Sequence, residues 1–431
     1  MILSRKFYLR LIVLLMCVAS GNDATAQFWK KEKPRRKVYN KYPPKPVAEV
    51  KKEEKKKKKR DIDYPASTKK ERYRIDVMIP LYLDELVKGG KPTPRSKWPD
   101  KAESGINFYE GIKLAIDTLA TMGYTTDIYV HDISGAESGV EKMIKSDSLA
   151  NSDLIIGFVS AQHVDDLAKY AKSKHVNFIS AFSPSDANVR DNPYFILMNP
   201  TLQTNCEEIS KAAVKKRNKE SLVLYKRMNN VTDSAAYSYI IEDSKVKNIS
   251  EIDCDKLPDS ATLVAAFDSM ITNIIIMPVI DVAYAEKLIN QLDKYFPNYR
   301  FNIFGMPSWK NIVSTKKMID FGEHIAINIT QPYYFDQTVS FGMDIANKYR
   351  ANFGGKPSEL TFRGFELVYW MTDLLNKYGA VFNEKTSDNG MAIFTKFEFK
   401  PQWDTENNLF YIENKHLYLY HYQAGTVLVE Q

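Results

Sequence analysis

The chain has 431 residues and a formal net charge of +7, from 60 Lys and Arg against 53 Asp and Glu. Residues 1–71 carry 21 basic and 8 acidic residues, whereas residues 72–431 carry 39 and 45. A nucleic-acid-binding protein carries its basic residues on the folded surface, so this distribution excludes nucleic acid as the expected partner.

Residues 1–26 have the pattern of a signal peptide. A basic start precedes a short apolar run at 11–19, and Ala24-Thr25-Ala26 fits a signal-peptidase site. This run is too short to cross a bilayer, which takes about 20 residues. The alternative to a signal peptide is a buried N-terminal strand. A lipoprotein signal requires a small residue before the cysteine, and Met16 precedes Cys17 instead. We therefore expect export to the periplasm and cleavage after Ala26, with outer-membrane association left open.

Residues 27–71 are predicted to form a disordered basic linker. They are rich in Pro and Lys, include the run EVKKEEKKKKKR at 49–60, and contain few apolar residues that could form a core. Like-charged and Pro-rich segments are extended. The linker is either a solvated spacer or a contact to an anionic membrane surface or to peptidoglycan.

Residues 72–200 show alternating strand and helix patterns. Apolar strand segments are expected at 74–81, 127–132, 153–159 and 176–182, and helical apolar spacing occurs at 108–122, 140–149 and 165–174. Such alternation predicts an α/β lobe, a doubly wound parallel sheet with helices on both faces.

A second series follows, and then a tail of different character. Strand segments are expected at 221–225, 273–277, 301–304 and 324–330, with helices at 234–242, 284–295, 339–353 and 362–378. The tail has short aromatic strand segments at 394–399, 409–412, 417–422 and 426–429. Two doubly wound lobes with an antiparallel tail are therefore predicted.

Several stretches resemble the type I periplasmic binding protein family, in particular the branched-chain amino-acid receptors of ABC transporters. The resemblance covers nearly all of residues 72–431 and rests on RIDVMIPLYL at 74, NFYEGIKLAIDTL at 107, DLIIGFVSAQHVDDLAKYAKSKHVNFISAFS at 153, NPYFILMNPT at 192 and FGMDIANKYRANFGGKPSELTFRGFELVYWM at 341. It implies three crossings between lobes, near 197–202, 330–335 and 397–403. Lobe one would then comprise 72–200 plus 336–396, and lobe two 201–330 plus 403–431.

Candidate ligand-binding residues follow from the rule that open α/β sheets bind ligands beyond the carboxyl ends of their strands. In lobe one these residues are Ser160, Ala161, Gln162, Ala181 and Ser183, and in lobe two they are Arg227 and Asp281. The first three begin a helix, whose N–H groups suit an anion, although Ser160 could serve only as a cap.

The resemblance implies that the lobe-one loops hold a ligand carboxylate and that a lobe-two acid pairs with an ammonium group. Asp281 is the candidate acid. The sequence departs from the family at Arg227, where the receptors usually offer an aromatic residue or Gly. The expected ligand is therefore amino-acid-like or another small anion.

Signatures of catalysis and of metal or phosphate binding do not occur in the sequence. It lacks HExxH, Gly-x-Ser-x-Gly, Walker A and Gly-x-Gly-x-x-Gly motifs. We expect no enzymatic activity, no metal and no cofactor. Cys206 and Cys254 could form one disulfide or remain free and buried.

Two functional hypotheses follow. The first is a periplasmic ligand-binding protein whose lobes close on a small molecule for uptake or sensing, with a membrane permease or envelope protein as partner. The alternative is an envelope scaffold or regulator that keeps the fold, has lost its small ligand and is tethered by the basic linker.

Overall fold

The computed structural model describes residues 62, 64–93, 98–134, 139–217, 222–243, 246–335 and 340–430. The predicted signal peptide and the predicted linker up to residue 61 lie outside the described residues. All described residues belong to one unit of the chain, which contains both lobes. Among the described helices, none has the length and apolar composition that crossing a membrane requires.

The first lobe is built on one of the two large sheets. Among the described residues its seven strands have the order β13-β14-β7-β6-β5-β1-β4. Their bounds are Tyr73–Ile79 (β1), Thr126–Asp132 (β4), Leu154–Gly157 (β5), Asn177–Ser180 (β6), Phe195–Leu197 (β7), Phe399–Trp403 (β13) and Leu409–Asn414 (β14). Neighbouring strands are parallel except β13 with β14. The predicted parallel sheet is confirmed.

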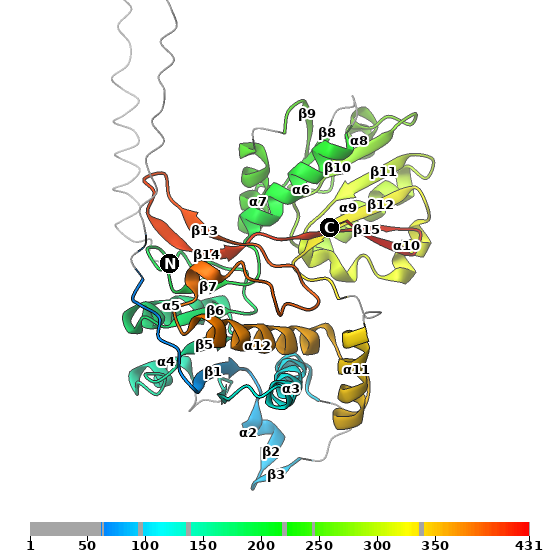
Figure 1. Cartoon of the computed structure of the whole chain (residues 1–431). Helices are drawn as coiled ribbons and strands as arrows, with labels where there is room; N and C mark the ends of the chain where they lie inside the picture. Colours follow the sequence, from blue (N-terminus) through cyan, green and yellow to red (C-terminus); the bar gives the residue numbers. More distant parts are fainter. Residues whose placement is uncertain are drawn as a thin grey trace, which may run out of the picture. The chain divides into compact units, whose positions relative to one another are not determined.

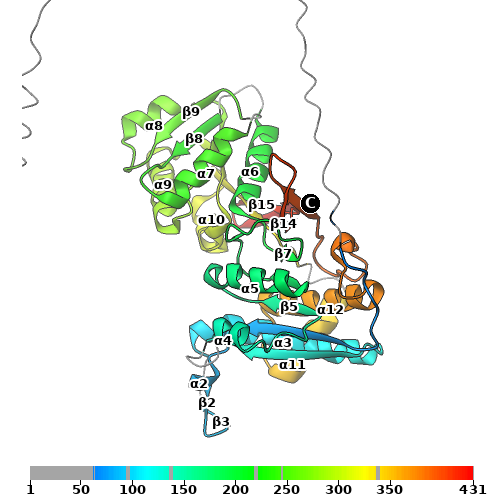
Figure 2. The ribbon, with the colours of Figure 1, turned by 90° about the vertical axis from the view of Figure 1, so that its left-hand side faces the viewer.

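Helices cover both faces of this sheet, as Figures 1 and 2 show. On one face, α3 (Asp100–Thr121), α11 (Ser340–Phe353) and α12 (Glu359–Tyr378) share an apolar core with the strands. On the other face, α4 (Val140–Lys145) and α5 (Ala161–Lys174) build a second core. A short helix α2 (Leu83–Leu86), a small ribbon of β2 (Val87–Lys88) and β3 (Lys91–Pro92), and the 3-10 turn η2 (Asn383–Lys385) complete the lobe.

Two glycines allow α3 and α12 to pack at close range. A Cβ atom on Gly111 would lie 1.9 Å from the carbonyl oxygen of Thr361, and one on Gly364 would lie 2.2 Å from that of Phe108. Neither distance is compatible with a side chain, because protein interiors have no free volume to absorb such an overlap. The backbone contact between these helices therefore requires glycine at both positions.

The second lobe repeats the arrangement. Among the described residues its strands have the order β16-β15-β12-β11-β10-β8-β9. Their bounds are Leu222–Lys226 (β8), Ile249–Asp253 (β9), Thr272–Ile276 (β10), Arg300–Phe304 (β11), Ile325–Gln331 (β12), Tyr418–Gln423 (β15) and Thr426–Glu430 (β16). Its helices are α6 (Leu202–Lys216), α7 (Val231–Glu242), α8 (Ser260–Ala266), α9 (Val282–Tyr295), α10 (Thr315–Phe321) and the 3-10 turn η1 (Pro307–Asn311).

Within the described part of the chain, the backbone passes between the two sheets three times. The first two crossings, after β7 and after β12, lie where the sequence predicts them. The third was expected at 397–403, but it lies between β14 and β15, at residues 415–417. β14 pairs in parallel with β7, through Ile412 opposite Ile196, so it belongs to lobe one rather than to lobe two. The predicted antiparallel tail is therefore wrong for this pairing, although β13, β15 and β16 do pair antiparallel with their neighbours.

Buried polar side chains form hydrogen bonds and an ion pair where the backbone crosses between the lobes. Glu413, which is 1% exposed, accepts hydrogen bonds from the Thr201 N–H at 2.8 Å and the Thr201 hydroxyl at 2.9 Å. It also forms an ion pair with Lys415 at 2.8 Å. Asn205 accepts a hydrogen bond from the Thr330 hydroxyl at 2.7 Å. Because buried polar groups are costly unless paired, these bonds fix where the three crossings meet.

Residues 64–71, predicted to be the end of a disordered linker, instead lie against lobe one. The Ser67 hydroxyl donates to the carbonyl oxygen of Tyr378 at 2.7 Å, and Lys70 pairs with Asp153 at 2.5 Å. The ring of Tyr64 meets that of Tyr194 edge-on at 6.1 Å. The segment that leads into the fold is therefore fastened to lobe one.

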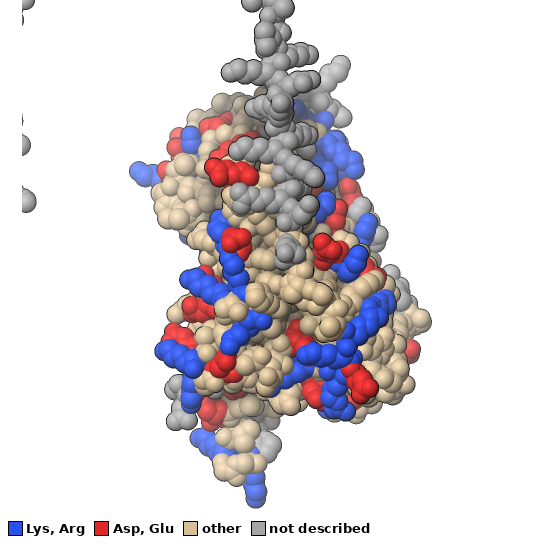
Figure 3. Space-filling view, turned by 60° about the vertical axis from the view of Figure 1, so that its left-hand side comes forward, with Lys and Arg blue, Asp and Glu red and all other residues tan. Residues whose placement is uncertain are grey.

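The surface carries charged side chains of both signs (Figure 3), and the two cysteines of the described residues are buried. On the face shown in Figure 3, basic and acidic side chains lie next to one another. Lobe one includes ion pairs such as Lys172 with Asp191 at 2.8 Å. Cys206 and Cys254 are both free and buried, and burial raises the pKa of each thiol to about 12. The alternative of two free thiols is therefore the one observed.

Candidate functional site

The predicted lobe-one residues lie on the two loops that follow β5 and β6. Ser160, Ala161 and Gln162 are exposed at the start of α5. Ser160 occupies the N-cap position, but within the described residues its hydroxyl makes no capping hydrogen bond to α5. Ala181 and Ser183 are each 4% exposed. The three residues at the start of α5 are thus exposed, whereas Ala181 and Ser183 are buried on either side of Phe182, which is 44% exposed.

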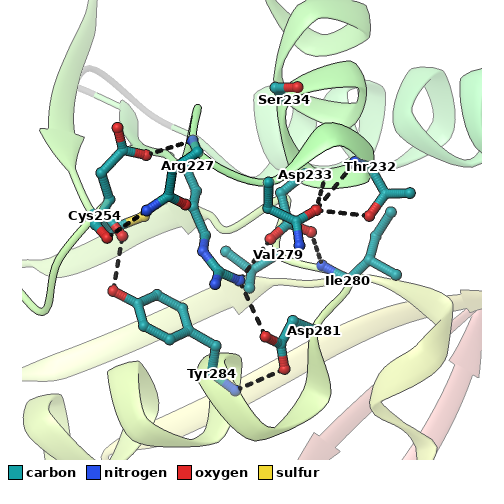
Figure 4. Close-up of polar contacts among 12 residues, drawn as sticks. Arg227, Thr232, Asp233, Ser234, Cys254, Val279, Ile280, Asp281 and Tyr284 are labelled. Atoms are coloured by element: carbon teal, nitrogen blue, oxygen red, sulfur yellow. Dashed lines mark hydrogen bonds and ion pairs between the residues drawn. The ribbon is translucent and has the colours of Figure 1, made fainter. Parts of the chain in front are cut away.

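The predicted lobe-two residues, Arg227 and Asp281, contact each other. Figure 4 shows the Arg227 guanidinium between two carboxylates, at 2.8 Å from Asp233 and 3.3 Å from Asp281. It also lies over the ring of Tyr284, 3.9 Å from the ring centroid. Only 13% of the Arg227 side chain is exposed. Its charge is therefore already balanced by side chains of this chain.

Both carboxylates have structural roles besides this ion pair. Asp233 is fully buried and accepts the Ile280 N–H at 2.7 Å, while Asp281 caps α9 by accepting the Tyr284 N–H at 3.1 Å. That backbone hydrogen bond, followed by the neighbouring Arg227, holds the pKa of Asp281 below its ordinary value. Asp281 is therefore an ionised and occupied carboxylate.

Sequence reasoning missed Asp233 and Tyr284, although one signal was present. Asp233 is the third residue of α7, after the N-cap Asn230. Acidic residues are favoured at this position of a helix. Arg227 directly follows β8, and a helix that starts four residues later, at Val231, brings such an acid back toward the arginine.

A cavity of about 350 Å³ lies between the lobes. Its walls come from the loops after β6 and β7 in lobe one, the loops after β10 and β11 in lobe two, the end of β12, and α12. These loops follow the carboxyl ends of parallel strands, where open α/β sheets bind ligands. The volume is at the lower end of that of small-molecule sites.

The lining of the cavity is largely apolar. It comprises four prolines, three other apolar residues, four uncharged polar residues and one charged residue: Pro184, Pro200, Pro307, Pro332; Leu202, Ile280, Met306; Asn199, Asn205, Ser308, Gln331; and Arg363. The seven predicted site residues are not in this lining, but Ser183 and Asp281 are sequence neighbours of Pro184 and Ile280.

Solved structures with the same architecture were found by structural comparison. A putative branched-chain amino-acid ABC transporter protein from Rhodospirillum rubrum matches with a TM-score of 0.59 and 11% identity, over 83% of this chain and 100% of that one. An ABC transporter substrate-binding protein from Desulfitobacterium hafniense, in complex with Leu, matches at 0.53 and 12%, over 83% and 100%. The fold is the type I periplasmic binding fold.

The same fold also occurs in a protein of different description. The C-terminal domain of LpoA from Haemophilus influenzae, described as a regulator of PBP1A, matches with a TM-score of 0.53 and 13% identity, over 83% of this chain and 100% of that one. No family model matches the sequence, and no curated protein matches it significantly. The expected resemblance to periplasmic binding proteins is thus confirmed for the fold.

In this periplasmic binding fold, an ion cluster joins the lobes beside the cavity. Lys310, from η1 of lobe two, pairs with Glu359 at the start of α12 in lobe one. Glu359 also pairs with Arg363, one turn later. Burial alone would raise the pKa of Glu359, but Arg363 and Lys310 outweigh it and hold the pKa below its ordinary value.

The remaining polar side chains of the lining are mostly satisfied. The Ser308 hydroxyl donates to the Ile280 carbonyl at 3.0 Å, and the Gln331 amide donates to that of Pro307 at 3.0 Å. Trp309 follows Ser308 but is fully buried in lobe two, where its indole N–H donates to Val279 at 2.7 Å. The indole therefore does not fill the cavity.

Proposed function

We propose that this protein is an exported ligand-binding protein whose two lobes close on a small molecule. The observation that carries the proposal is the cavity of about 350 Å³, which is lined by strand-end loops of both lobes and by residues of the first two crossings. The Desulfitobacterium protein of the same fold is described in complex with Leu, which supports a small molecule as ligand. The signal-peptide pattern of residues 1–26 supports the periplasm as the compartment.

A binding screen tests this proposal. The mature chain is screened by thermal shift and native mass spectrometry against amino acids, short peptides, carboxylic acids and sugars. A true ligand raises the melting temperature because it binds the folded state alone. Absence of any binder in the whole screen contradicts the proposal.

A matched pair of variants locates the binding site. Ser308→Trp places a large ring at the cavity wall, whereas Ser173→Trp places one on the exposed surface of α5. Both serines are exposed, and both donate their hydroxyl to a backbone carbonyl, that of Ile280 and of Tyr170 respectively. Only Ser308→Trp is expected to abolish the ligand-induced shift. Equal binding by both variants would place the ligand elsewhere.

A second function, that of an envelope scaffold or regulator, is favoured by a different observation. Arg227 and Asp281 are already paired with each other, so the lobe-two residues expected to meet an amino acid are occupied. The LpoA domain, described as a regulator, has the same fold. In this role the basic linker would tether the fold to peptidoglycan or to an anionic membrane, and the partner would be an envelope protein.

Deletion of residues 27–63 separates the two functions. The deletion spares 64–71, which contact lobe one and would disturb its stability if removed. A transport or sensing receptor keeps its ligand affinity and its activity in cells without the linker. A scaffold folds normally without the linker but loses its position in the envelope, which fractionation or fluorescence imaging detects.

A further inference from the structure

The charges around the interlobe cavity bear on the class of ligand that it can accept. Among the described residues that line it, none is Asp or Glu, and the one charged side chain is Arg363. Asp281 adjoins the lining at Ile280, but its carboxylate is shared between Arg227 and the first turn of α9. An α-amino acid brings an ammonium group, and a buried ammonium without a carboxylate partner is costly.

The guanidinium of Arg363 is held in place and still has capacity for a partner. Its Nη2 pairs with Glu359, and its plane lies over the ring of Tyr333, 3.6 Å from the ring centroid. Among the described residues its buried Nε atom has no hydrogen-bond acceptor, and the same is true of the Nε atom of Arg227. Only 13% of the Arg363 side chain is exposed. A stacked arginine of this kind is suited to planar anions such as carboxylates.

The local charge also favours an anion. Glu359 is shared between Arg363 and Lys310, so two cations face one carboxylate and one positive charge is in excess. The opposite holds around Arg227, where one cation faces the two carboxylates of Asp233 and Asp281. A negatively charged ligand is therefore attracted toward the α12 side of the cavity.

We propose that the cavity binds a small anion that has an apolar hydrocarbon part and no ammonium group, such as the carboxylate of a short branched carboxylic acid. Arg363 pairs with the ligand's carboxylate, and the prolines with Leu202, Ile280 and Met306 contact its hydrocarbon part. This inference rests on the proposed binding function. It differs from that function in naming the ligand class and the residue that selects it.

Three probes with related carbon skeletons test the ligand class on the mature wild-type chain. They are 4-methylpentanoate, leucine and 3-methylbutylamine, so leucine is compared with its analogue without the ammonium group and its analogue without the carboxylate. Isothermal titration is expected to show 4-methylpentanoate binding at least about tenfold more tightly than leucine, and no binding of the amine.

The outcomes distinguish this inference from the proposed function. If leucine or the amine binds as tightly as 4-methylpentanoate, the ligand class is wrong and the binding function stands. The same holds if the wider screen finds only sugars or ammonium-bearing ligands. If no compound binds at all, both proposals fail.

Variants of Arg363 test its role as the anion partner. Arg363→Gln is expected to weaken the binding of 4-methylpentanoate about tenfold or more and to leave the binding of the neutral 4-methylpentanamide unchanged. Arg363→Lys, which keeps the positive charge, is expected to restore part of the lost affinity. Arg350→Gln is the control, since Arg350 is exposed on α11 and donates to Asn347 at 3.2 Å. Equal weakening of acid and amide would refute an ionic role for Arg363. If Arg363→Gln does not fold, the comparison of the three probes on the wild type still decides the ligand class.

Discussion

Asp76 is a fully buried charged residue of lobe one, and its replacement by Asn tests how much its ion pair and hydrogen bonds stabilise the fold. Asp76 lies on β1 with no exposed surface. Arg74 donates to its two oxygens at 2.8 and 2.9 Å, and the Ser152 hydroxyl donates at 2.6 Å. His131 Nε2 lies 2.7 Å from the same carboxylate. All four contacts depend on acceptor oxygens, and the contact with Arg74 depends on the negative charge as well.

The expected loss of unfolding free energy follows from the unpaired Arg74 guanidinium that Asp76→Asn leaves in the fold. Asn keeps one acceptor oxygen but no charge, so the Arg74 guanidinium loses its counter-ion. Removing one partner of a buried ion pair costs about 3–5 kcal/mol. Arg74 remains 24% exposed, lies 4.3 Å from the Tyr129 ring centroid and donates to the Ser148 carbonyl, so we expect the lower end, about 3 kcal/mol.

The assay compares Asp76→Asn with Asp127→Asn in urea unfolding. Asp127 pairs with Arg72 at 2.6 Å, but the two side chains are 40% and 62% exposed, so its replacement should cost about 0–1 kcal/mol. In a Trp309→Phe background, the tryptophans that remain among the described residues are Trp98, Trp370 and Trp403, all in lobe one, so tryptophan fluorescence follows this lobe. Equal losses of unfolding free energy in the two variants would refute the reasoning.

The pH dependence of the same pair of proteins provides a second check. Burial alone would raise the pKa of Asp76, but the hydrogen bonds from His131, Arg74 and Ser152 outweigh it and hold the pKa below its ordinary value. The unfolded carboxyl titrates at about 3.9. The stabilisation is therefore complete above that pH and is lost as the pH falls through the lower folded pKa. The difference between wild type and Asp76→Asn should shrink in the same range.

Three further substitutions have defined outcomes. Gly111→Ala forces a Cβ atom against the Thr361 carbonyl and should lower the unfolding free energy by about 2–3 kcal/mol in urea titration; an unchanged value would contradict the close helix contact. Burial raises the pKa of Glu366, so wild-type stability should fall as the pH rises through that pKa, while Glu366→Gln should show no such fall in pH-dependent melting. Lys310→Gln removes the excess positive charge beside the cavity and should weaken carboxylate binding roughly two- to fivefold by titration calorimetry. Lys317→Gln, which removes a cation paired with a lobe-two glutamate, should leave that binding unchanged.

The parallel sheets could be predicted from the sequence because their central strands are continuous apolar runs. β5 and β6 are buried along their whole length, as parallel strands covered on both faces must be. Two parallel strands escaped the prediction. β7 has three residues, which is too few to show a period, and β9 leaves most of its residues at least partly exposed. Local pattern fails for strands that are very short or that lie at a sheet edge.

The tail shows a different limit. Its four segments all appear as short aromatic strands, and nothing within them indicates which lobe each one joins. β14 pairs in parallel with β7, whereas β15 pairs antiparallel with β12. The segment expected as a strand at 394–399 is irregular until Phe399, and the N–H groups of residues 393–395 donate to the buried carboxylate of Glu366. Such long-range pairings decide the lobe boundary and are not encoded locally.

Arg227 and Arg363 show why the candidate site could be predicted only in part. Arg227 could be predicted as a site residue because it follows the carboxyl end of β8. Its position in the sequence does not indicate that its guanidinium forms ion pairs with Asp233 and Asp281. Arg363 lies within a helix, so a rule based on strand ends does not select it. It reaches the cavity because α12 begins beside the second crossing. A lobe-two cluster with one negative charge in excess repels an anion, and a cluster on α12 with one positive charge in excess attracts it. The anion that we propose as ligand therefore has Arg363 as its expected partner, whereas Arg227 pairs with Asp233 and Asp281 within lobe two.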